Sequence, residues 1–305
     1  MQVRCISKDE LKTFINSYPD KSYRNWIDKL LEKKETKPEW CFIGEEADKF
    51  LGKIVYFQFQ GEESMICAVG LDLPWEGDYI GVGEELLTKS FKELKNYYTI
   101  IKIEIRCDTG DEYYQNIIEL CEKVGCNLIQ DKFSYVLTDF NNPENERKRL
   151  FFKSLDEVGE EKFIRAIKSV TEKTLDRVDK QDVEILGAEP AAREYFNVLK
   201  SIDFNEKNWV LGYDKQNNLV GLVIAQNFSE KTGCINYIGV VPEFRGNNYS
   251  FDLSLKATQL LSSSDFLKKI IADIDTQNIP LEKTLQKLNF QKSEQMWIYH
   301  KYLKQ

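Results

Sequence analysis

The sequence predicts an α/β protein made of two domains with similar topology, and three observations support this fold class. Strand-like and helix-like segments alternate along the 305 residues. The same order of segments occurs once in each half of the chain. In addition, the stretch that starts at Glu122 aligns without gaps on the stretch that starts at Gln286. Self-similarity over a long period indicates a duplicated domain, so we expect domains at 1–143 and 144–305.

The first half carries strand and helix signals in a definite order. Branched and aromatic residues indicate strands, apolar residues three or four positions apart indicate helices, and Pro or Gly indicate loops. In chain order we expect a strand at 3–6, helical residues at 8–31, strands at 40–43, 51–59 and 65–71, a loop at 74–83 before a helix at 86–94, a strand at 101–107, a helix at 113–124 and a strand at 133–138.

The second half repeats this order. In chain order we expect a strand at 149–153, helices at 163–170 and 191–200, strands at 209–213, 219–226 and 234–241, a loop at 242–246 before a helix at 253–261, a strand at 269–274, a helix at 281–288 and a strand at 296–302. Between the halves, residues 139–149 are polar and include turn-forming residues, so we place the boundary between the domains there.

Composition excludes several classes of protein. With 42% hydrophobic and 30% charged residues, the chain has enough apolar surface for packed cores and is not expected to be disordered. A net charge of -8 without a basic tail argues against nucleic acid or an anionic membrane as the partner. The longest apolar run, 219–225, has the length of a strand. The first ten residues lack the apolar core of a signal peptide, so we expect a cytoplasmic protein.

The cysteine and histidine content restricts the chemistry further. The seven cysteines include no CxxC pair and are odd in number, which favours reduced thiols over a disulfide framework. His300 is the only histidine, and we interpret it as a polar position on the last strand. Nucleophiles that depend on a histidine, and zinc sites built from several histidines, are therefore not expected, and neither is any other metal site.

The segment most informative about function is 237–253. A buried strand ends at Pro242, a short loop with Arg245 and Gly246 follows, and an amphipathic helix begins. A helix that starts after such a turn directs several backbone N–H groups at one spot, which favours a phosphate or pyrophosphate. Gly246 permits close backbone approach, Asn248 can adopt a left-handed conformation, and Arg245 adds a planar set of donors. The residues alone are equally compatible with an ordinary strand-to-helix turn.

This segment resembles the GNAT superfamily of acyl-CoA-dependent N-acyltransferases. The family motif reads Val-x-Pro-x-x-Arg-Gly-x-Gly-x-Gly/Ala. The chain keeps Val240, Pro242, Arg245 and Gly246, and has Asn248 and Ser250 at the two later positions. The resemblance covers the second half and implies, for each domain, a mixed and mostly antiparallel central sheet flanked by helices.

A second family pattern lies downstream of the first. The family has Asn-x-x-Ala and then Tyr-x-x-x-Gly-Phe, and the corresponding residues here are Asn278, Leu281, Leu285, Asn289 and Phe290. The position of the tyrosine, which often protonates the leaving thiolate in this family, is therefore Leu285. Tyr249 and Tyr237 are the candidate donors in its place, and water is the alternative. No general base is identified.

The resemblance also implies what the second domain binds. Acetyl-CoA would be the co-substrate, and an amine of a small molecule or peptide would be the acceptor. Ile238 and Val240 would pair with the pantetheine arm of CoA through their strand, and Asn278 would contact the pantetheine amides. Main-chain N–H groups of one loop would bind the pyrophosphate; its residues are Arg245, Gly246, Asn247, Asn248, Tyr249 and Ser250.

The first repeat matches the family less well. It keeps Pro74, Gly81 and Gly83, but Asp78 stands at the position of the motif arginine and Cys121 at that of the tyrosine. A carboxylate at a helix start repels a pyrophosphate, although it suits the helix dipole. We therefore expect a degenerate copy at 1–143, retained for packing and for shaping the acceptor cleft, before an N-acetyltransferase domain at 144–305.

A different class of function is also compatible with the sequence. The same scaffold could be a module that binds acyl-CoA or another ligand without catalysis, or one that binds a protein. The missing tyrosine at Leu285 and the changes to Asn248 and Asn289 favour this alternative, whereas Arg245, Gly246 and Asn278 oppose it.

Overall fold

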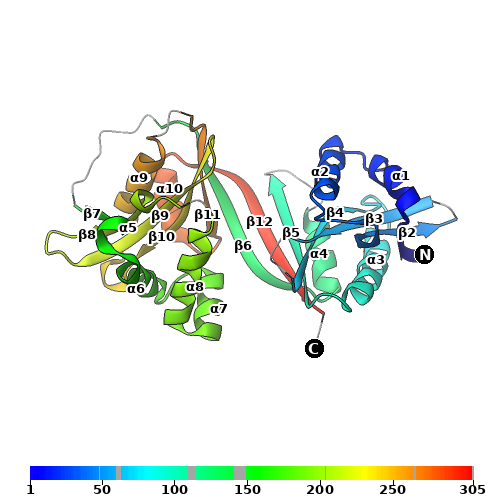
Figure 1. Cartoon of the computed structure of the whole chain (residues 1–305), viewed down its shortest axis with the longest axis horizontal. Helices are drawn as coiled ribbons and strands as arrows, with labels where there is room; N and C mark the ends of the chain where they lie inside the picture. Colours follow the sequence, from blue (N-terminus) through cyan, green and yellow to red (C-terminus); the bar gives the residue numbers. More distant parts are fainter. Residues whose placement is uncertain are drawn as a thin grey trace. The chain divides into compact units, whose positions relative to one another are not determined.

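The computed structural model describes residues 1–47, 49–59, 63–108, 114–140, 149–202, 204–263 and 266–303. The predicted domain boundary after residue 143 lies in 141–148, outside these residues. The chain forms two compact units (Figure 1): unit 1 contains 1–130 and 296–305, and unit 2 contains 131–295. Among the helices described, none combines the length and the apolar character needed to cross a membrane.

Unit 1 contains a mixed sheet with the strand order β1-β2-β3-β4-β5-β12. Its strands are β1 (Gln2–Cys5), β2 (Cys41–Glu46), β3 (Lys49–Phe57), β4 (Met65–Asp72), β5 (Ile100–Asp108) and the part of β12 (Gln291–Tyr302) that starts at Met296. Its helices are α1 (Leu11–Asn16), α2 (Lys21–Glu32), α3 (Tyr79–Leu94) and α4 (Tyr114–Lys123). The pairs from β1 to β4 are antiparallel, and β4 and β5 are parallel.

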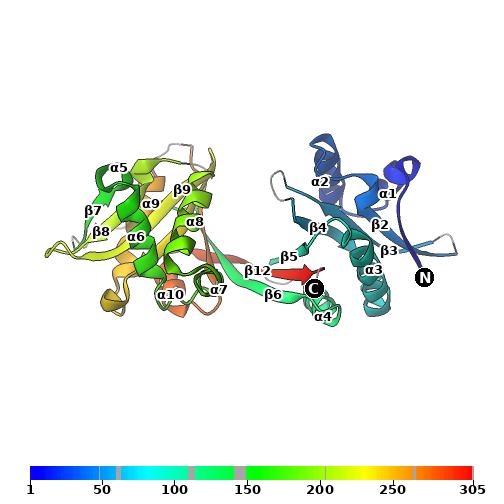
Figure 2. The same cartoon turned by 60° about the horizontal axis from the view of Figure 1, so that its bottom comes forward.

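Successive side chains on the strands of unit 1 enter two different cores. Phe42 and Tyr56 pack with residues of α3 and α4, whereas Ile43 and Val55 pack with residues of α1 and α2. Because neighbouring side chains on a strand point to opposite sides, this alternation indicates a sheet that is covered on both faces. Figure 2 accordingly shows α1 and α2 on one face and α3 and α4 on the other.

Unit 2 has the strand order β6-β11-β10-β9-β8-β7. Its strands are β7 (Phe151–Ser154), β8 (Trp209–Tyr213), β9 (Leu219–Ser229), β10 (Thr232–Val240), β11 (Lys269–Asp275) and the part of β6 (Asn127–Leu137) that starts at Asp131. Its helices are α5 (Leu155–Val158), α6 (Glu160–Thr171), α7 (Arg177–Leu186), α8 (Ala188–Lys200), α9 (Tyr249–Leu261) and α10 (Ile279–Lys287). The predicted class, a mostly antiparallel sheet flanked by helices in each part, is confirmed.

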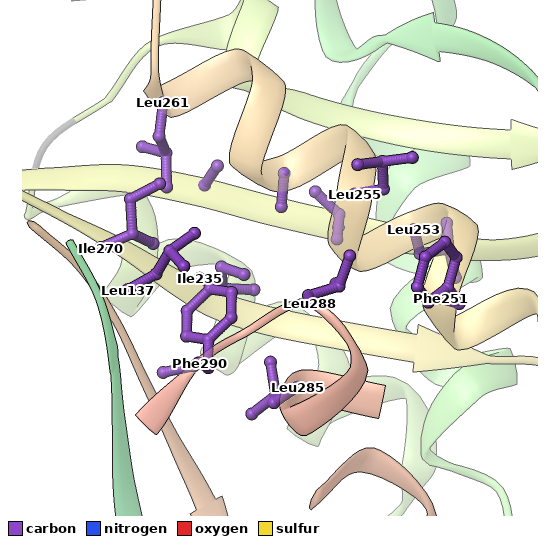
Figure 3. Packing of buried hydrophobic residues seen from close by; sticks show 14 of the residues in the cluster. Leu137, Ile235, Phe251, Leu253, Leu255, Leu261, Ile270, Leu285, Leu288 and Phe290 are labelled. Carbon is purple, nitrogen blue, oxygen red and sulfur yellow. The ribbon is translucent and has the colours of Figure 1, made fainter. Parts of the chain in front are cut away.

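The sheet of unit 2 also separates two cores. Val210 and Val223 pack with residues of α9 and α10, whereas Leu211 and Leu222 pack with residues of α6 and α8. Figure 3 shows the core on the α9 side, in which side chains of α10, including Leu285, converge with those of α9 and the strands. This packing holds α9 and α10 against the sheet, where their first residues lie beside β10.

The strands β10 and β11 pair over only a short distance. Their parallel pairing runs from Thr232 to Cys234 of β10, whereas the antiparallel pairing of β10 with β9 continues to Val240. A register shift between Ile235 and Tyr237 marks a β-bulge. Beyond Cys234, the edge of β10 that faces β11 therefore has no strand partner among the described residues, and this open edge positions the site described below.

The structure adds two details to the expected secondary structure. The helical residues expected at 8–31 form two helices, α1 and α2. Proline at position 19 lacks a donor N–H, and the next residue, Asp20, begins a new helix as its N-cap. The helix α7 was not expected: five of its ten residues are charged, and none of them is fully buried.

The last strand of each repeat belongs to the compact unit of the other repeat. Residues 132–137 of β6, at the end of the first repeat, pair with β11 inside unit 2. In the same way Trp297 and Tyr299 of β12, at the end of the second repeat, are buried in the core of unit 1. Sequence repeats and compact units are therefore different divisions of this chain.

Candidate functional site

A pocket of about 370 Å³ lies at the open edge of β10 in unit 2. Its walls come from the end of α6 and the following loop, from β10, from the loop before α9, and from the start of α10. The residues that the sequence suggested for binding CoA lie in these walls, with the exception of Asn247; they are Ile238, Val240, Arg245, Gly246, Asn248, Tyr249, Ser250 and Asn278. Segments far apart in the sequence thus meet at one cavity.

The backbone of β10 offers hydrogen-bonding groups to this pocket. The N–H of Val241 donates to the carbonyl of Val220 on β9 at 2.9 Å. Because N–H groups alternate between the two edges of a strand, those of Val240 and Ile238 point to the opposite edge. That edge is not paired with β11 beyond Cys234. Two main-chain donors therefore face the pocket along β10.

The loop before α9 has the backbone conformation of an anion-binding turn. Gly246 has φ 82° and Asn248, the N-cap of α9, has φ 61° and ψ 26°. The left-handed conformation predicted for Asn248 is confirmed. Within the part of the chain that the structure describes, none of the backbone N–H groups from Gly246 to Ser250 donates a hydrogen bond. Free donors at the start of a helix attract an anion.

The guanidinium of Arg245 is engaged with the protein itself. It donates to the carbonyls of Val240 at 3.0 Å and Lys173 at 2.9 Å. It also donates to the carbonyls of Val170 at 3.0 Å and Glu172 at 2.7 Å. Arg245 therefore holds the loop against the end of α6 and satisfies carbonyls there, and what the loop presents to the pocket is its backbone.

A second arginine, which sequence reasoning missed, lies on the other side of this loop. Arg149 donates to the carbonyls of Asn247 at 3.0 Å and Asn248 at 3.1 Å. It also forms an ion pair with Asp252, and it stacks over the ring of Tyr249 at 4.6 Å. By binding the loop carbonyls from outside, Arg149 favours the orientation in which the loop N–H groups face the pocket.

Replacing Arg149 by methionine is expected to weaken the binding of acetyl-CoA by about 10-fold, the scale of one hydrogen bond to a charged group. The variant frees the loop carbonyls and leaves the buried carboxylate of Asp252, whose side chain is 5% exposed, without its cation. Calorimetric titration measures the change. The double variant R149M/D252N should recover part of the affinity, and the surface variant Arg193→Met should bind as the wild type does. Equal affinity in all variants would contradict this role.

The two tyrosines proposed as proton donors have different surroundings. The ring of Tyr249 lies between the guanidinium of Arg149 and the ring of Phe244, whose centroid is 6.0 Å away. Tyr237 packs on Tyr195 at 4.8 Å, and its hydroxyl donates to Oδ2 of Asp179 at 3.1 Å. Burial raises the pKa of Tyr237 well above its usual value. Leu285 is 1% exposed and lies in the core of Figure 3.

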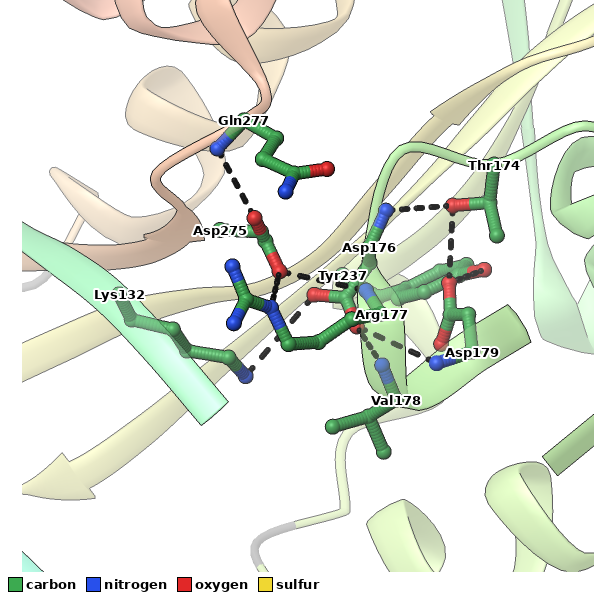
Figure 4. Close-up of polar contacts among 9 residues, drawn as sticks. All are labelled: Lys132, Thr174, Asp176, Arg177, Val178, Asp179, Tyr237, Asp275 and Gln277. Carbon is green, nitrogen blue, oxygen red and sulfur yellow. Dashed lines mark hydrogen bonds and ion pairs between the residues drawn. The ribbon is translucent and has the colours of Figure 1, made fainter. Parts of the chain in front are cut away.

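Asp179 is the second residue of the site that sequence reasoning missed, because it lies on the unpredicted helix α7. Besides Tyr237, the hydroxyl of Thr174 donates to its Oδ2 at 3.4 Å (Figure 4). Burial and the neighbouring carboxylate of Asp176 raise its pKa to about 7, against the lowering effect of the Tyr237 hydrogen bond and of Lys132. Titratable groups with such shifts concentrate at functional sites.

The start of α7 is fixed by two further carboxylates. Asp176 caps the helix by accepting from the N–H groups of Val178 at 2.9 Å and Asp179 at 3.2 Å. Asp275, which is 2% exposed, accepts from Nε of Arg177 at 2.9 Å and from the N–H of Gln277 at 2.9 Å. Figure 4 shows these contacts joining α7 to the turn after β11. They fix the position of Asp179, which accepts a hydrogen bond from the pocket residue Thr174.

The corresponding helix start in unit 1 is occupied by a side chain. Asp78 is the N-cap of α3, and its carboxylate accepts from the N–H of Gly81 at 2.9 Å. A cavity of about 460 Å³ lies between β4 and β5, but its walls include no residue of the first turn of α3. Among the residues described in either unit, no cluster of three or more histidine, cysteine or acidic side chains could hold a metal ion.

Comparison with known proteins gives one match to a sequence family. Residues 175–290 match the acetyltransferase (GNAT) family. Comparison with curated protein sequences gives no match.

Among solved structures, the chain is similar to a GCN5-related N-acetyltransferase from Sphaerobacter thermophilus, with a TM-score of 0.57, 12% identity, and coverage of 100% of this chain and 96% of that chain. It is also similar to a tandem GNAT protein from the clavulanic acid biosynthesis pathway, with a TM-score of 0.51, 11% identity, and coverage of 100% of this chain and 99% of that chain. At these identities the likeness concerns the fold.

Proposed function

Residues 175–290 belong to the GNAT family, and from this premise we propose that unit 2 transfers an acetyl group from acetyl-CoA to the amine of a small molecule or peptide. The observation that carries the proposal is the row of N–H groups from Gly246 to Ser250 that have no acceptor among the described residues, at a pocket whose other wall is the open edge of β10. A pyrophosphate needs several convergent donors, and a strand edge suits the amides of a pantetheine arm.

Each part of the pocket has a role in this proposal. The loop N–H groups and the start of α9 bind the pyrophosphate, with Arg245 and Arg149 as positioning residues that fix the loop from two sides. The N–H groups of Ile238 and Val240 pair with the pantetheine arm, and one of them polarises the thioester carbonyl. When bound, acetyl-CoA supplies the acyl group in a form that an uncharged amine attacks directly.

The two asparagines that replace family glycines keep the required backbone conformation. Asn248 has φ 61° and Asn289 has φ 64°, both in the left-handed region that asparagine tolerates better than most residues. These changes therefore do not favour a module that has lost its site. The buried side chain of Leu285 still favours the alternative of binding without catalysis, because no tyrosine stands at that position.

Two measurements test the proposal together. Calorimetric titration with acetyl-CoA should find one site per chain, because Asp78 occupies the helix start in unit 1. Release of free thiol from acetyl-CoA, followed across a broad set of amines, should then depend on the amine. Binding without amine-dependent release would establish the non-catalytic module instead. If acetyl-CoA did not bind, both the acetyltransferase and the non-catalytic acyl-CoA-binding module would be excluded.

A further inference from the structure

Given the proposed acyl transfer, on which this inference rests, we infer that Asp179 takes the proton from a cationic alkylamine acceptor. We infer also that Tyr237 acts through Asp179, as a positioning residue, rather than as the acid that protonates the thiolate. The two side chains are joined by the 3.1 Å hydrogen bond from the Tyr237 hydroxyl to the Asp179 carboxylate.

The position of this pair relative to the pocket supports the inference. Thr174 lines the pocket, and its hydroxyl donates to Asp179. Ile238, which follows Tyr237 on β10, lines the pocket as well. Asp179 is therefore one hydrogen bond away from a residue of the pocket wall, and Tyr237 is the chain neighbour of another. A base that serves an amine attacking a carbonyl on β10 belongs at this place.

The surroundings of Tyr237 make it a poor acid. Its proton is already donated to Asp179, and burial raises its pKa well above the usual value, with Asp179 and Tyr195 adding to the shift. A phenol releases a proton less readily as its pKa rises. The same hydrogen bond stabilises the charged form of Asp179. The role of the Tyr237 hydroxyl is therefore to keep this carboxylate ionised.

The groups that face Asp179 give it the basicity that the reaction needs. Burial and Asp176 raise its pKa to about 7, while the hydroxyl of Tyr237 and the ammonium of Lys132 lower it. Asp182 on the same helix adds negative charge, and Tyr195 packs against Tyr237 from α8. An ordinary aspartate would be too weak a base for an alkylammonium, whereas a group that titrates near neutral pH is matched to this task.

The proton and electron balance of the step is complete without a further reactant. The ammonium gives one proton to the Asp179 carboxylate, and the freed lone pair forms the bond to the carbonyl carbon. The carbon–sulfur bond breaks with its electron pair on sulfur, and the second proton of the nitrogen goes to the thiolate. Asp179 then returns its proton to water. Only an acceptor that is protonated at neutral pH needs the first transfer, and the negative charge around Asp179 favours such a cation.

The test compares a charged with an uncharged acceptor. The probes are 2-phenylethylamine, which is cationic at neutral pH, and aniline, which is not. Asp179→Asn should lower kcat/KM for 2-phenylethylamine at pH 7 by about 100- to 1,000-fold and change that for aniline much less. Glu184→Gln, on the same helix but not among the groups that shift the pKa of Asp179, should change neither. Equal losses for both amines in D179N would overturn the inference and leave the proposed function intact, whereas a wild type inactive toward both would count against the function itself.

The pH profile separates the role of Tyr237 from that of an acid. The rate with 2-phenylethylamine should fall below about pH 7 in the wild type, as Asp179 becomes protonated. Tyr237→Phe removes the hydrogen bond that lowers the pKa of Asp179. The decrease of rate should therefore begin at a higher pH in this variant. If Y237F showed the same decrease of rate at low pH as the wild type and lost rate only at alkaline pH, Tyr237 would be identified as the acid. That result would overturn its assignment as a positioning residue.

Thermal unfolding gives a readout that requires no acceptor. The pKa of Asp179 is about 7 in the folded protein against an ordinary 3.8, so the folded state binds the proton more tightly. Its contribution to stability is then fully present below about pH 4 and is lost as the pH rises to about 7. The difference in Tm between D179N and the wild type should therefore shift in favour of D179N as the pH is raised from 4 to 8. A constant difference would show that Asp179 titrates normally and would overturn the inference.

Discussion

Replacing Gly246 by aspartate is expected to lower the affinity for acetyl-CoA by about 100-fold or more, since each charge-assisted hydrogen bond is worth about 1.5–3 kcal/mol. Gly246 has φ 82°, and apart from Gly246 itself and its two chain neighbours no described residue has a heavy atom within 4 Å of the position of an added Cβ. The new carboxylate has room beside the free N–H groups of the loop. It should accept from them as Asp78 accepts from Gly81 in unit 1, and it should repel the pyrophosphate.

A matched control separates the charge at the pocket from strain in the backbone. Gly159, the N-cap of α6, has φ 80° and equally open surroundings, and it does not line the pocket. Gly159→Asp therefore introduces the same strain and the same charge elsewhere in unit 2. Calorimetry should show wild-type affinity in this control. Wild-type affinity in G246D as well would exclude the loop as the pyrophosphate site.

Removal of residues 296–305 is expected to unfold unit 1 while unit 2 keeps its structure. Trp297 and Tyr299 are 8% and 2% exposed in the core of unit 1, and loss of one large aromatic side chain from a core costs about 3–5 kcal/mol. Trp297 also stacks on Tyr114 at 5.1 Å. Lys301 donates to the carbonyl of Val124 at 2.7 Å, at the end of α4. The combined loss approaches the whole stability of a typical domain.

Hydrogen exchange measured by mass spectrometry tests this expectation. Peptides from β4 and β5 should lose protection in the truncated chain, whereas peptides from β9 and β10 should keep it. Titration with acetyl-CoA should still find its site, because residues 131–295 remain. The point variant Trp297→Phe should cause a smaller loss of protection in the same peptides. Full protection of β5 after truncation would contradict the assignment of these residues to the core of unit 1.

The parts of the fold that could be predicted are those with a strong local pattern. The strands β8 and β9 carry runs of buried apolar residues, and the loop after β10 carries a proline, an arginine and a glycine within a few positions. Each of these features is formed by residues that are close together in the chain, so it can be recognised in the sequence alone. The left-handed conformation of Asn248 was predicted for the same reason, from the residue type at a helix start.

The residues that could not be predicted depend on contacts between distant segments. Arg149 lies 98 positions before Asn247, and no spacing rule relates the two. The pKa of Asp179 is raised by burial and then by Asp176, and the Tyr237 hydroxyl that opposes this shift comes from a residue 58 positions away. The charge state of a group depends on everything packed around it, so one aspartate among many carries no local signal.

The exchange of last strands between the two repeats has a consequence for protein synthesis. A nascent chain releases residues 1–130 well before 296–302, so unit 1 lacks the strand that carries Trp297 and Tyr299 for most of translation. Domains usually complete their folding in the order in which they are synthesised. Here unit 2, whose residues end at 295, can finish first. Until then the edge of β5 that later receives β12 stays open, and it is the place where a nascent chain is most exposed to pairing with the wrong strand.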